Sequence, residues 1–142
     1  MFQDRVLSGM RPTGAMHLGH YHGALKNWVR LQNEYPCLFF AADWHALTSH
    51  YEDPSVIEST VWDMFVDWLA AGIDPAKATL FVQSHVPEVS ELCWILMTGA
   101  PLGLLERCHA YKEKKAKGLT ADAGLFTYPV LMSADILAFD SH

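Results

Sequence analysis

The chain contains three short apolar runs, at residues 5–8, 37–42 and 79–83, each followed by glycine or polar residues. A buried strand typically appears as such a run of about four to eight residues between turn signals. Helical spacing of apolar residues fills both intervals between the runs. The alternation strand–helix–strand–helix–strand with short connections predicts an α/β fold with a doubly wound parallel sheet and right-handed crossovers.

Apolar residues at Leu18, Tyr21, Leu25 and Trp28 predict a helix over residues 18–31. Further helices are predicted over residues 55–72, 88–98, 102–117 and 125–139, whereas residues 43–54 have the composition of a loop. Ligands of parallel sheets bind beyond the carboxyl ends of the strands. The segments that follow the strands, residues 9–20, 43–50 and 83–87, are therefore the candidates for function.

Composition restricts the class of protein. With 142 residues, 51% hydrophobic and 18% charged, the chain suits one domain with a buried core. No apolar run approaches the roughly 20 residues of a membrane span, so we expect no membrane association. The net charge of −6 disfavours a general nucleic-acid binder, although five of the ten basic residues crowd into residues 107–117. Cys37, Cys93 and Cys108 are odd in number and widely spaced, which argues against disulfides and favours a cytoplasmic location.

The loop after the first run reads S-G-M-R-P-T-G-A-M-H-L-G-H, residues 8–20. Its glycines allow the backbone to approach a ligand closely. His17 and His20 lie at a helix start, where free N–H groups favour an anion and imidazole N–H groups can bind phosphate. The motifs G-x-G-x-x-G and G-x-x-x-x-G-K-[ST] are absent. A metal site is disfavoured because His20 and His22 lie on different helix faces; the alternative of histidines that only cap the helix stays open.

The sequence P-T-G-x-x-H-L-G-H resembles the HIGH signature of class I aminoacyl-tRNA synthetases, which have a Rossmann-like fold. The resemblance implies that this loop binds ATP, and that His17 and His20 are catalytic through contacts with the phosphates. The ATP-binding residues that it implies are Gly9, Arg11, Pro12, Thr13, Gly19 and His20.

Three more stretches resemble the tryptophan and tyrosine subgroup of this family: residues 39–48, residues 72–87 and L-F-T-Y-P-V-L-M-S-A-D-I-L at 125–137. The last two are most similar to its tryptophan members. The resemblance implies that Asp135 accepts a hydrogen bond from the substrate's indole N–H, which is a donor only. Met132 and Ile136 would form part of the apolar wall of the amino-acid pocket, and His45 would lie at its edge. Leu7 would stand in this pocket where some relatives carry an aromatic residue.

The implied reaction is attack of the L-tryptophan carboxylate on the α-phosphate of ATP, followed by transfer of the aminoacyl group to the tRNA for tryptophan. Mg²⁺ bound to the substrate would neutralise the departing pyrophosphate. Lys114, in a matching Y-K-E-K stretch, is the candidate to reach the pyrophosphate. The resemblance also implies a homodimer, with an interface near residues 92–105, although the apolar run 94–97 could equally be core.

Three alternatives remain. A tyrosine-specific relative usually carries a tyrosine near the end of the first strand, where this chain has Val6, Leu7 and Ser8, and a glutamine three residues before the aspartate, where it has Met132. A nucleotidylyltransferase shares an H-x-G-H loop but nothing like the setting of Asp135. A non-catalytic nucleotide-binding module is the third. No K-M-S-K-S-like loop or anticodon-binding domain is present, so we expect residues 1–142 to be the amino-terminal part of a longer catalytic domain, with an incomplete sheet.

Overall fold

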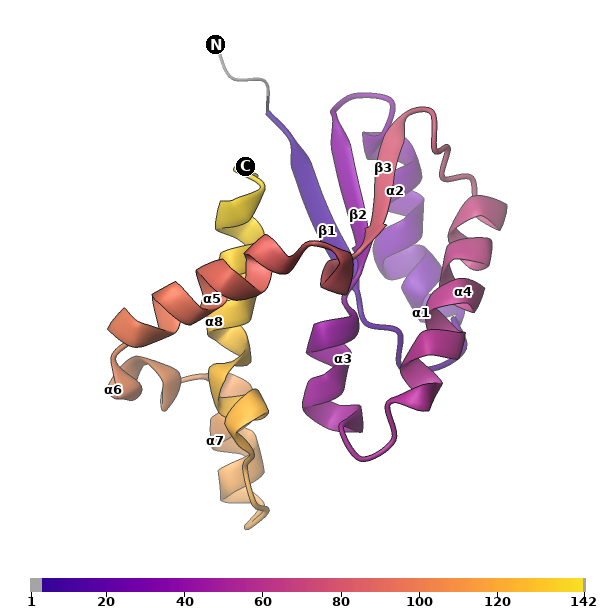
Figure 1. The fold of residues 1–142 in the computed structure, drawn as a ribbon. Helices are drawn as coiled ribbons and strands as arrows, with labels where there is room; N and C mark the ends of the chain where they lie inside the picture. The colour runs from indigo at the N-terminus through magenta and orange to yellow at the C-terminus, as the bar shows by residue number, and fades with distance from the viewer. Residues whose placement is uncertain (1–3, 142) are drawn as a thin grey trace.

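The computed structural model describes residues 4–141. Its three strands, β1 (Val6–Met10), β2 (Cys37–Ala41) and β3 (Ala78–Val82), form one parallel sheet in the order β1-β2-β3 (Figure 1). The first residues of the strands are paired with one another, so the three carboxyl ends lie level. The parallel α/β architecture predicted from the apolar runs is confirmed.

One face of the sheet is covered by α2 (Lys26–Leu31) and α4 (Ser55–Ala70), as Figure 1 shows. Trp28 stacks on Phe39 with 4.4 Å between the ring centroids and meets Trp68 edge-on at 5.1 Å. All three rings are buried, and burying such side chains contributes several kcal/mol each. This aromatic cluster fixes β2 against the helices.

Successive residues of β2 point to opposite faces. Phe39 faces α2, whereas Phe40 stacks on Phe81 of β3 at 5.3 Å. On this second face Phe81 also meets Phe139, which follows α8 (Ala123–Ala138), at 5.1 Å, and Arg5 donates a hydrogen bond to the Phe139 carbonyl. These contacts hold the end of α8 against the sheet.

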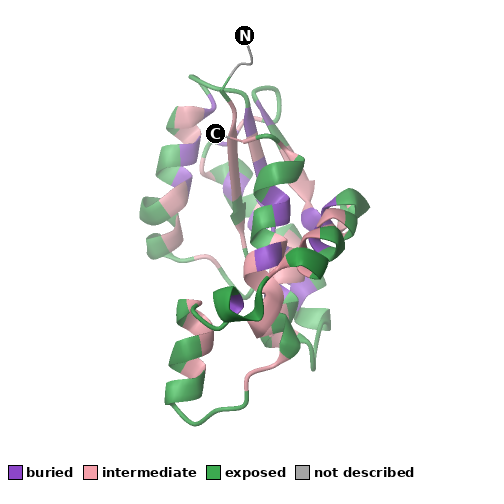
Figure 2. Ribbon diagram, turned by 90° about the vertical axis from the view of Figure 1, so that its left-hand side faces the viewer, coloured by how far each residue is buried: buried purple, intermediate pink, exposed green. Residues whose placement is uncertain are grey.

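Further helices form a second unit around α8 (Figure 1). They are α5 (Pro87–Gly99), α6 (Leu102–Leu105) and α7 (His109–Ala116). Figure 2 shows buried residues on the inner sides of this unit as well as in the sheet. Its core consists of Val89, Cys93, Leu105, Val130 and Ala134. No helix within residues 4–141 is both long and apolar enough to cross a membrane.

The prediction of a loop after β2 was wrong, because Asp43–His50 forms helix α3. The Asp43 carboxylate accepts hydrogen bonds from the backbone N–H groups of Trp44 (3.1 Å) and Ser84 (3.0 Å). Ala46 is fully buried, and α3 packs between α4 and α8. An eight-residue helix is marginal by propensity alone, so these tertiary contacts, invisible in the local pattern, decide its structure.

Two predicted helices are interrupted. The helix over residues 18–31 consists of α1 (Leu18–His20), a π-helical turn η1 (Tyr21–Leu25) and α2. The π turn shifts the helical phase, so Leu18 is 77% exposed and only the later apolar positions reach the core. The predicted helix 102–117 breaks at residues 106–108, between α6 and α7. The third strand ends at Val82, and Gln83–His85 forms a 3₁₀ turn, η2.

Candidate functional site

A cavity of about 540 Å³ lies between the sheet, α3 and α8. All five residues predicted to form the amino-acid pocket line it: Leu7, His45, Met132, Asp135 and Ile136. The other lining residues are Ser8, Gly9, Arg11, Phe40, Ala42, Thr48, Ala110, Leu125 and Tyr128. Segments that are up to 129 positions apart in sequence, from Leu7 to Ile136, therefore meet around one space, which combines apolar wall with the polar side chains of Ser8, Arg11, His45, Thr48, Tyr128 and Asp135.

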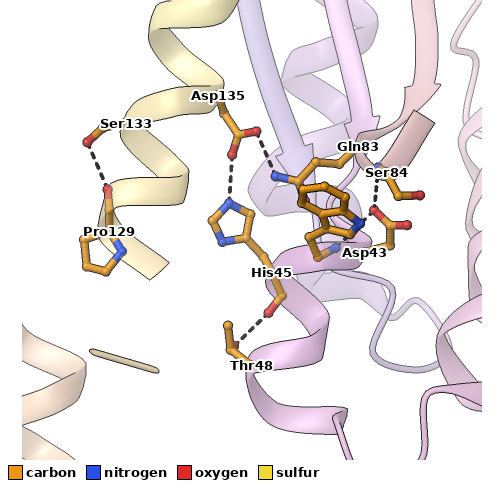
Figure 3. Close-up of polar contacts among 9 residues, drawn as sticks. Asp43, His45, Thr48, Gln83, Ser84, Pro129, Ser133 and Asp135 are labelled. Atoms are coloured by element: carbon orange, nitrogen blue, oxygen red, sulfur yellow. Dashed lines mark hydrogen bonds and ion pairs between the residues drawn. The ribbon is translucent and has the colours of Figure 1, made fainter. Parts of the chain in front are cut away.

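Asp135 is the buried acceptor of this cavity, with 3% of its surface exposed. Its Oδ2 lies 2.8 Å from Nε2 of His45, and its Oδ1 accepts a hydrogen bond from Nε2 of Gln83 at 2.8 Å (Figure 3). A buried carboxylate without such partners would be strongly destabilising. The alternative that Asp135 is a helix-surface carboxylate is therefore excluded.

Three elements hold this arrangement together. The first turn of α3, directly after β2, carries His45, and η2, directly after β3, carries Gln83. On α8, Met132, Asp135 and Ile136 are spaced i, i+3 and i+4, so they share one helix face. Met132 and Ile136 remain about half exposed, which places them at the border of the cavity while Asp135 lies at its base.

Gly9 is required by the close approach of Phe40. A Cβ atom at Gly9 would lie 2.5 Å from Cζ of Phe40, a separation at which one group must move. The Phe40 ring is itself buried and stacked on Phe81. Both Gly9 and Phe40 line the larger cavity, so the glycine gives the ring its position there.

A smaller cavity, of about 230 Å³, lies at the loop that follows β1. Its lining residues are Met10, Arg11, Thr13, Gly14, Ala15, Met16, His17, His20 and Met64. His17 caps the helix, because its Nδ1 accepts from the backbone N–H of Gly19 at 3.0 Å, and Nδ1 of His20 accepts from the N–H of His17 at 3.3 Å. With both Nδ1 atoms accepting, the neutral rings carry their proton on Nε2, where it can be donated to a phosphate oxygen.

Gly19 allows His17 to fold back over the helix start. A Cβ at Gly19 would lie 2.7 Å from Cε1 of the His17 ring. The two imidazoles are 3.9 Å apart between centroids, and partial burial, together with the neighbouring His17, lowers the pKa of His20. His20 is therefore neutral near pH 7 and suited to donate from Nε2.

The remaining predicted site residues occupy different positions. Arg11 is exposed and lines both cavities, so it stands where they adjoin. Thr13 lines the smaller cavity, while Pro12 is buried and shapes the loop. Lys114 lines neither cavity, and its ammonium is 3.1 Å from the Asp122 carboxylate. The structure thus does not bring Lys114 to the other predicted residues.

Sequence reasoning did not single out Gln83, although its signal was present. Gln83 is the first residue after β3, at the edge of the sheet where ligands of parallel sheets bind. Its contact with Asp135 spans 52 positions and could be found only in the folded chain.

The parallel sheet with its helices is a Rossmann-like fold, and the two adjoining cavities lie beyond the carboxyl ends of its strands. Residues 3–142 match the family described as tRNA synthetases class I (W and Y). The chain belongs to this family.

Known relatives are similar over nearly the whole chain. The tryptophan–tRNA ligase of Ralstonia nicotianae is 63% identical over 142 residues, which cover 98% of this chain and 36% of that protein. The crystal structure of tryptophanyl-tRNA synthetase from Campylobacter jejuni has a TM-score of 0.92 at 47% identity and covers 99% of this chain and 44% of that chain. A structure of the Campylobacter jejuni enzyme complexed with ADP and tryptophan has a TM-score of 0.89 at 48% identity and covers 97% and 43%. The chain thus spans less than half the length of these relatives.

Proposed function

We propose that this chain contributes to the ATP-dependent activation of L-tryptophan and its transfer to the tRNA for tryptophan. The observation that carries the proposal is the buried Asp135 carboxylate at the base of an otherwise mostly apolar cavity. Indole is a large apolar group with one donor, and it needs one acceptor in such a setting. The relatives named for this activity, one of them complexed with ADP and tryptophan, support the same substrates.

The position of the second cavity supports the mechanism. Arg11 borders both cavities, so a tryptophan carboxylate at the rim of the larger one and an ATP phosphate in the smaller one would meet beside its guanidinium. The Nε2–H groups of His17 and His20 would donate to phosphate oxygens as negative charge builds up on them. No covalent enzyme intermediate is required, because positioning and charge stabilisation carry the reaction.

Mg²⁺ belongs to this proposal as an ion that ATP carries. Mg²⁺ prefers oxygen ligands, whereas Arg11, His17 and His20, the ionisable side chains that line the smaller cavity, offer nitrogen donors. The ion would therefore be held by phosphate oxygens and water and would offset the charge of the departing pyrophosphate. Lys114 remains a candidate for pyrophosphate only if its contact with Asp122 opens.

The tyrosine alternative is less well supported. The tyrosine that tyrosine-specific relatives usually carry near the end of the first strand is missing, because Leu7 and Ser8 line the larger cavity there, and Met132 provides apolar wall in place of an amide. Both substitutions suit a bicyclic apolar ring better than a phenol.

We also propose how the protein assembles and where in the cell it is located. Trp94 and Ile95 on α5 are 67% and 64% exposed, whereas Leu96 and Met97 pack on the core of the helical unit. The apolar run at 94–97 is thus divided, and its exposed half supports a homodimer interface on α5.

The three free cysteines support a reducing compartment, and we propose the cytoplasm.

Tryptophan-dependent ATP–pyrophosphate exchange tests the proposal in the intact natural protein that carries this sequence. We expect exchange with L-tryptophan and exchange at least about 100-fold weaker with L-tyrosine. Equal exchange with both amino acids would remove the substrate assignment. Binding of ATP without any exchange would favour the non-catalytic nucleotide-binding module.

A further inference from the structure

Gln83 makes a buried contact with the carboxylate of the larger cavity without reaching the cavity itself. Its side chain is fully buried, and its Nε2 donates to Oδ1 of Asp135 at 2.8 Å. Figure 3 shows Gln83 and His45 approaching the carboxylate from different elements. Gln83 does not line the cavity, and its hydrogen bond to Asp135 connects it to a residue that does.

The orientation of the Gln83 amide is determined by its neighbour. Its Oε1 is buried and has no hydrogen-bond partner among the described residues. A rotated amide would place Oε1 against the Oδ1 acceptor of Asp135, and two acceptors repel each other. Gln83 therefore presents its N–H to Asp135 and leaves a buried carbonyl unpaired, which is unfavourable for stability.

Gln32 shows how a purely structural buried glutamine differs. Its Nε2 donates to the carbonyl of Gly72 at 2.9 Å, and its Oε1 accepts from the N–H of Asp74 at 2.9 Å. Both ends of Gln32 are thus paired with backbone in one loop. The Gln83 side chain, in contrast, makes a single hydrogen bond within residues 4–141, and that bond goes to the carboxylate of the candidate site.

We propose that Gln83 is a positioning residue for substrate selection, which orients the Asp135 carboxylate so that it accepts from the indole N–H. The inference rests on the proposed function and extends it to a residue outside the pocket. Gln83 holds Oδ1 and His45 lies on Oδ2, so the carboxylate cannot turn without breaking a buried contact. A fixed acceptor discriminates more sharply between ligands with and without a donor.

The test compares L-tryptophan with its benzothiophene analogue, in which sulfur replaces the indole N–H. Both are measured by ATP–pyrophosphate exchange in the intact natural protein and in Gln83→Met, which keeps the length of the side chain but removes the donor. We expect kcat/KM for tryptophan to fall about 10-fold or more and kcat/KM for the analogue to fall less than about 3-fold. The KM for ATP should be unchanged.

Gln32→Met is the matched control, because it also removes a buried amide but lies away from the cavity. It should lower thermal stability. The ratio of kcat/KM for tryptophan to kcat/KM for the analogue should stay as in the unsubstituted protein. If Gln83→Met fails to fold, Gln83→Leu, which also lacks a donor, is judged by the same ratio. Parallel losses with both substrates, or an unchanged ratio, would overturn the assignment of Gln83.

Asp135→Ala, which removes the acceptor, separates this inference from the proposed function. If Asp135→Ala reduces the ratio and the Gln83 variants do not, the role of Gln83 is wrong and the proposed function stands. If neither Asp135→Ala nor the Gln83 variants change the ratio, or if the protein shows no tryptophan-dependent exchange, both are wrong.

Discussion

The two cavities differ in how the chain holds their polar side chains. Asp135 is buried and takes its partners from residues 90 and 52 positions away in sequence. His17 is exposed, and the hydrogen bonds that orient His17 and His20 span only two or three residues. The geometry at Asp135 therefore depends on the fold of the whole chain, whereas the histidine loop is organised locally by its cap and its glycines.

This difference corresponds to two tasks in the proposed reaction. Selecting one amino acid requires a rigid acceptor in a dry pocket, because an unpaired polar group is costly only when it is buried. Binding a triphosphate, which many proteins share, requires donors that can adapt and remain accessible. Changes at Asp135 should accordingly affect which substrate reacts, and changes at the loop should affect how fast it reacts.

The largest effect is expected for Asp135→Ala. Without the carboxylate, a bound indole N–H loses its acceptor, and sites built around such a bond lose about 10⁴-fold or more in discrimination. Tryptophan activation in the intact protein should fall by this order, while ATP affinity measured by calorimetry stays within about 3-fold. Asp63→Ala, which removes an exposed carboxylate on α4 that lines neither cavity, is the control. Unchanged tryptophan kinetics in Asp135→Ala would rule out its role as acceptor.

A smaller effect is expected for His20→Ala. Loss of one preorganised donor to developing charge typically lowers turnover by about 10²–10³-fold. Pre-steady-state adenylate formation should slow by this amount, with a modest change in ATP affinity. If the ATP affinity alone changes and the chemical step keeps its rate, His20 binds the ground state and has no role in the transition state.

Gly19→Ala should act in the same direction through His17. The new Cβ would displace the His17 ring and open its bond to the Gly19 N–H. A displacement of about 1 Å can cost up to about 10²-fold in rate, so we expect adenylate formation to slow by about 10–100-fold. Gly23→Ala is the matched control, because a Cβ there meets nothing within 4 Å. Equal rates for the two variants would contradict the proposed positioning.

The same contrast explains which features the sequence could predict. The strands could be predicted because buried strands are short, continuous apolar runs. The histidine loop could be predicted because its contacts are local. The pocket residues at Leu7, His45 and Asp135 came from the family resemblance together with the rule that strand ends meet. Helix α3 and the bond from Gln83 to Asp135 escaped prediction because both depend on packing between distant segments. The π turn after His20 also left no signal in the apolar spacing.

The smallest effect concerns pH and the stability of the histidine loop. Partial burial and then the nearby His17 lower the pKa of His20 below its ordinary value of 6.5. In the unfolded chain His20 would bind a proton near pH 6.5, whereas in the folded chain it binds one only at lower pH. At a pH well above 6.5 both states are neutral at this residue, so its protonation has no effect on stability. As the pH falls below 6.5, the unfolded state gains the proton first, and the free energy of unfolding decreases until the folded pKa is reached.

His20→Gln isolates this contribution, because it removes the titrating group and keeps a polar side chain of similar size. Urea denaturation of the intact protein at pH 7.5 and pH 5.5 would measure it. The wild type should lose slightly more stability than His20→Gln between the two pH values, since only the wild type has the proton linkage at this site. Because His20 is largely solvated, the difference should be small compared with the kinetic effects above. An equal loss in both proteins would show that the loop does not hold His20 in its neutral form, and the donor role of its Nε2–H would then need another explanation.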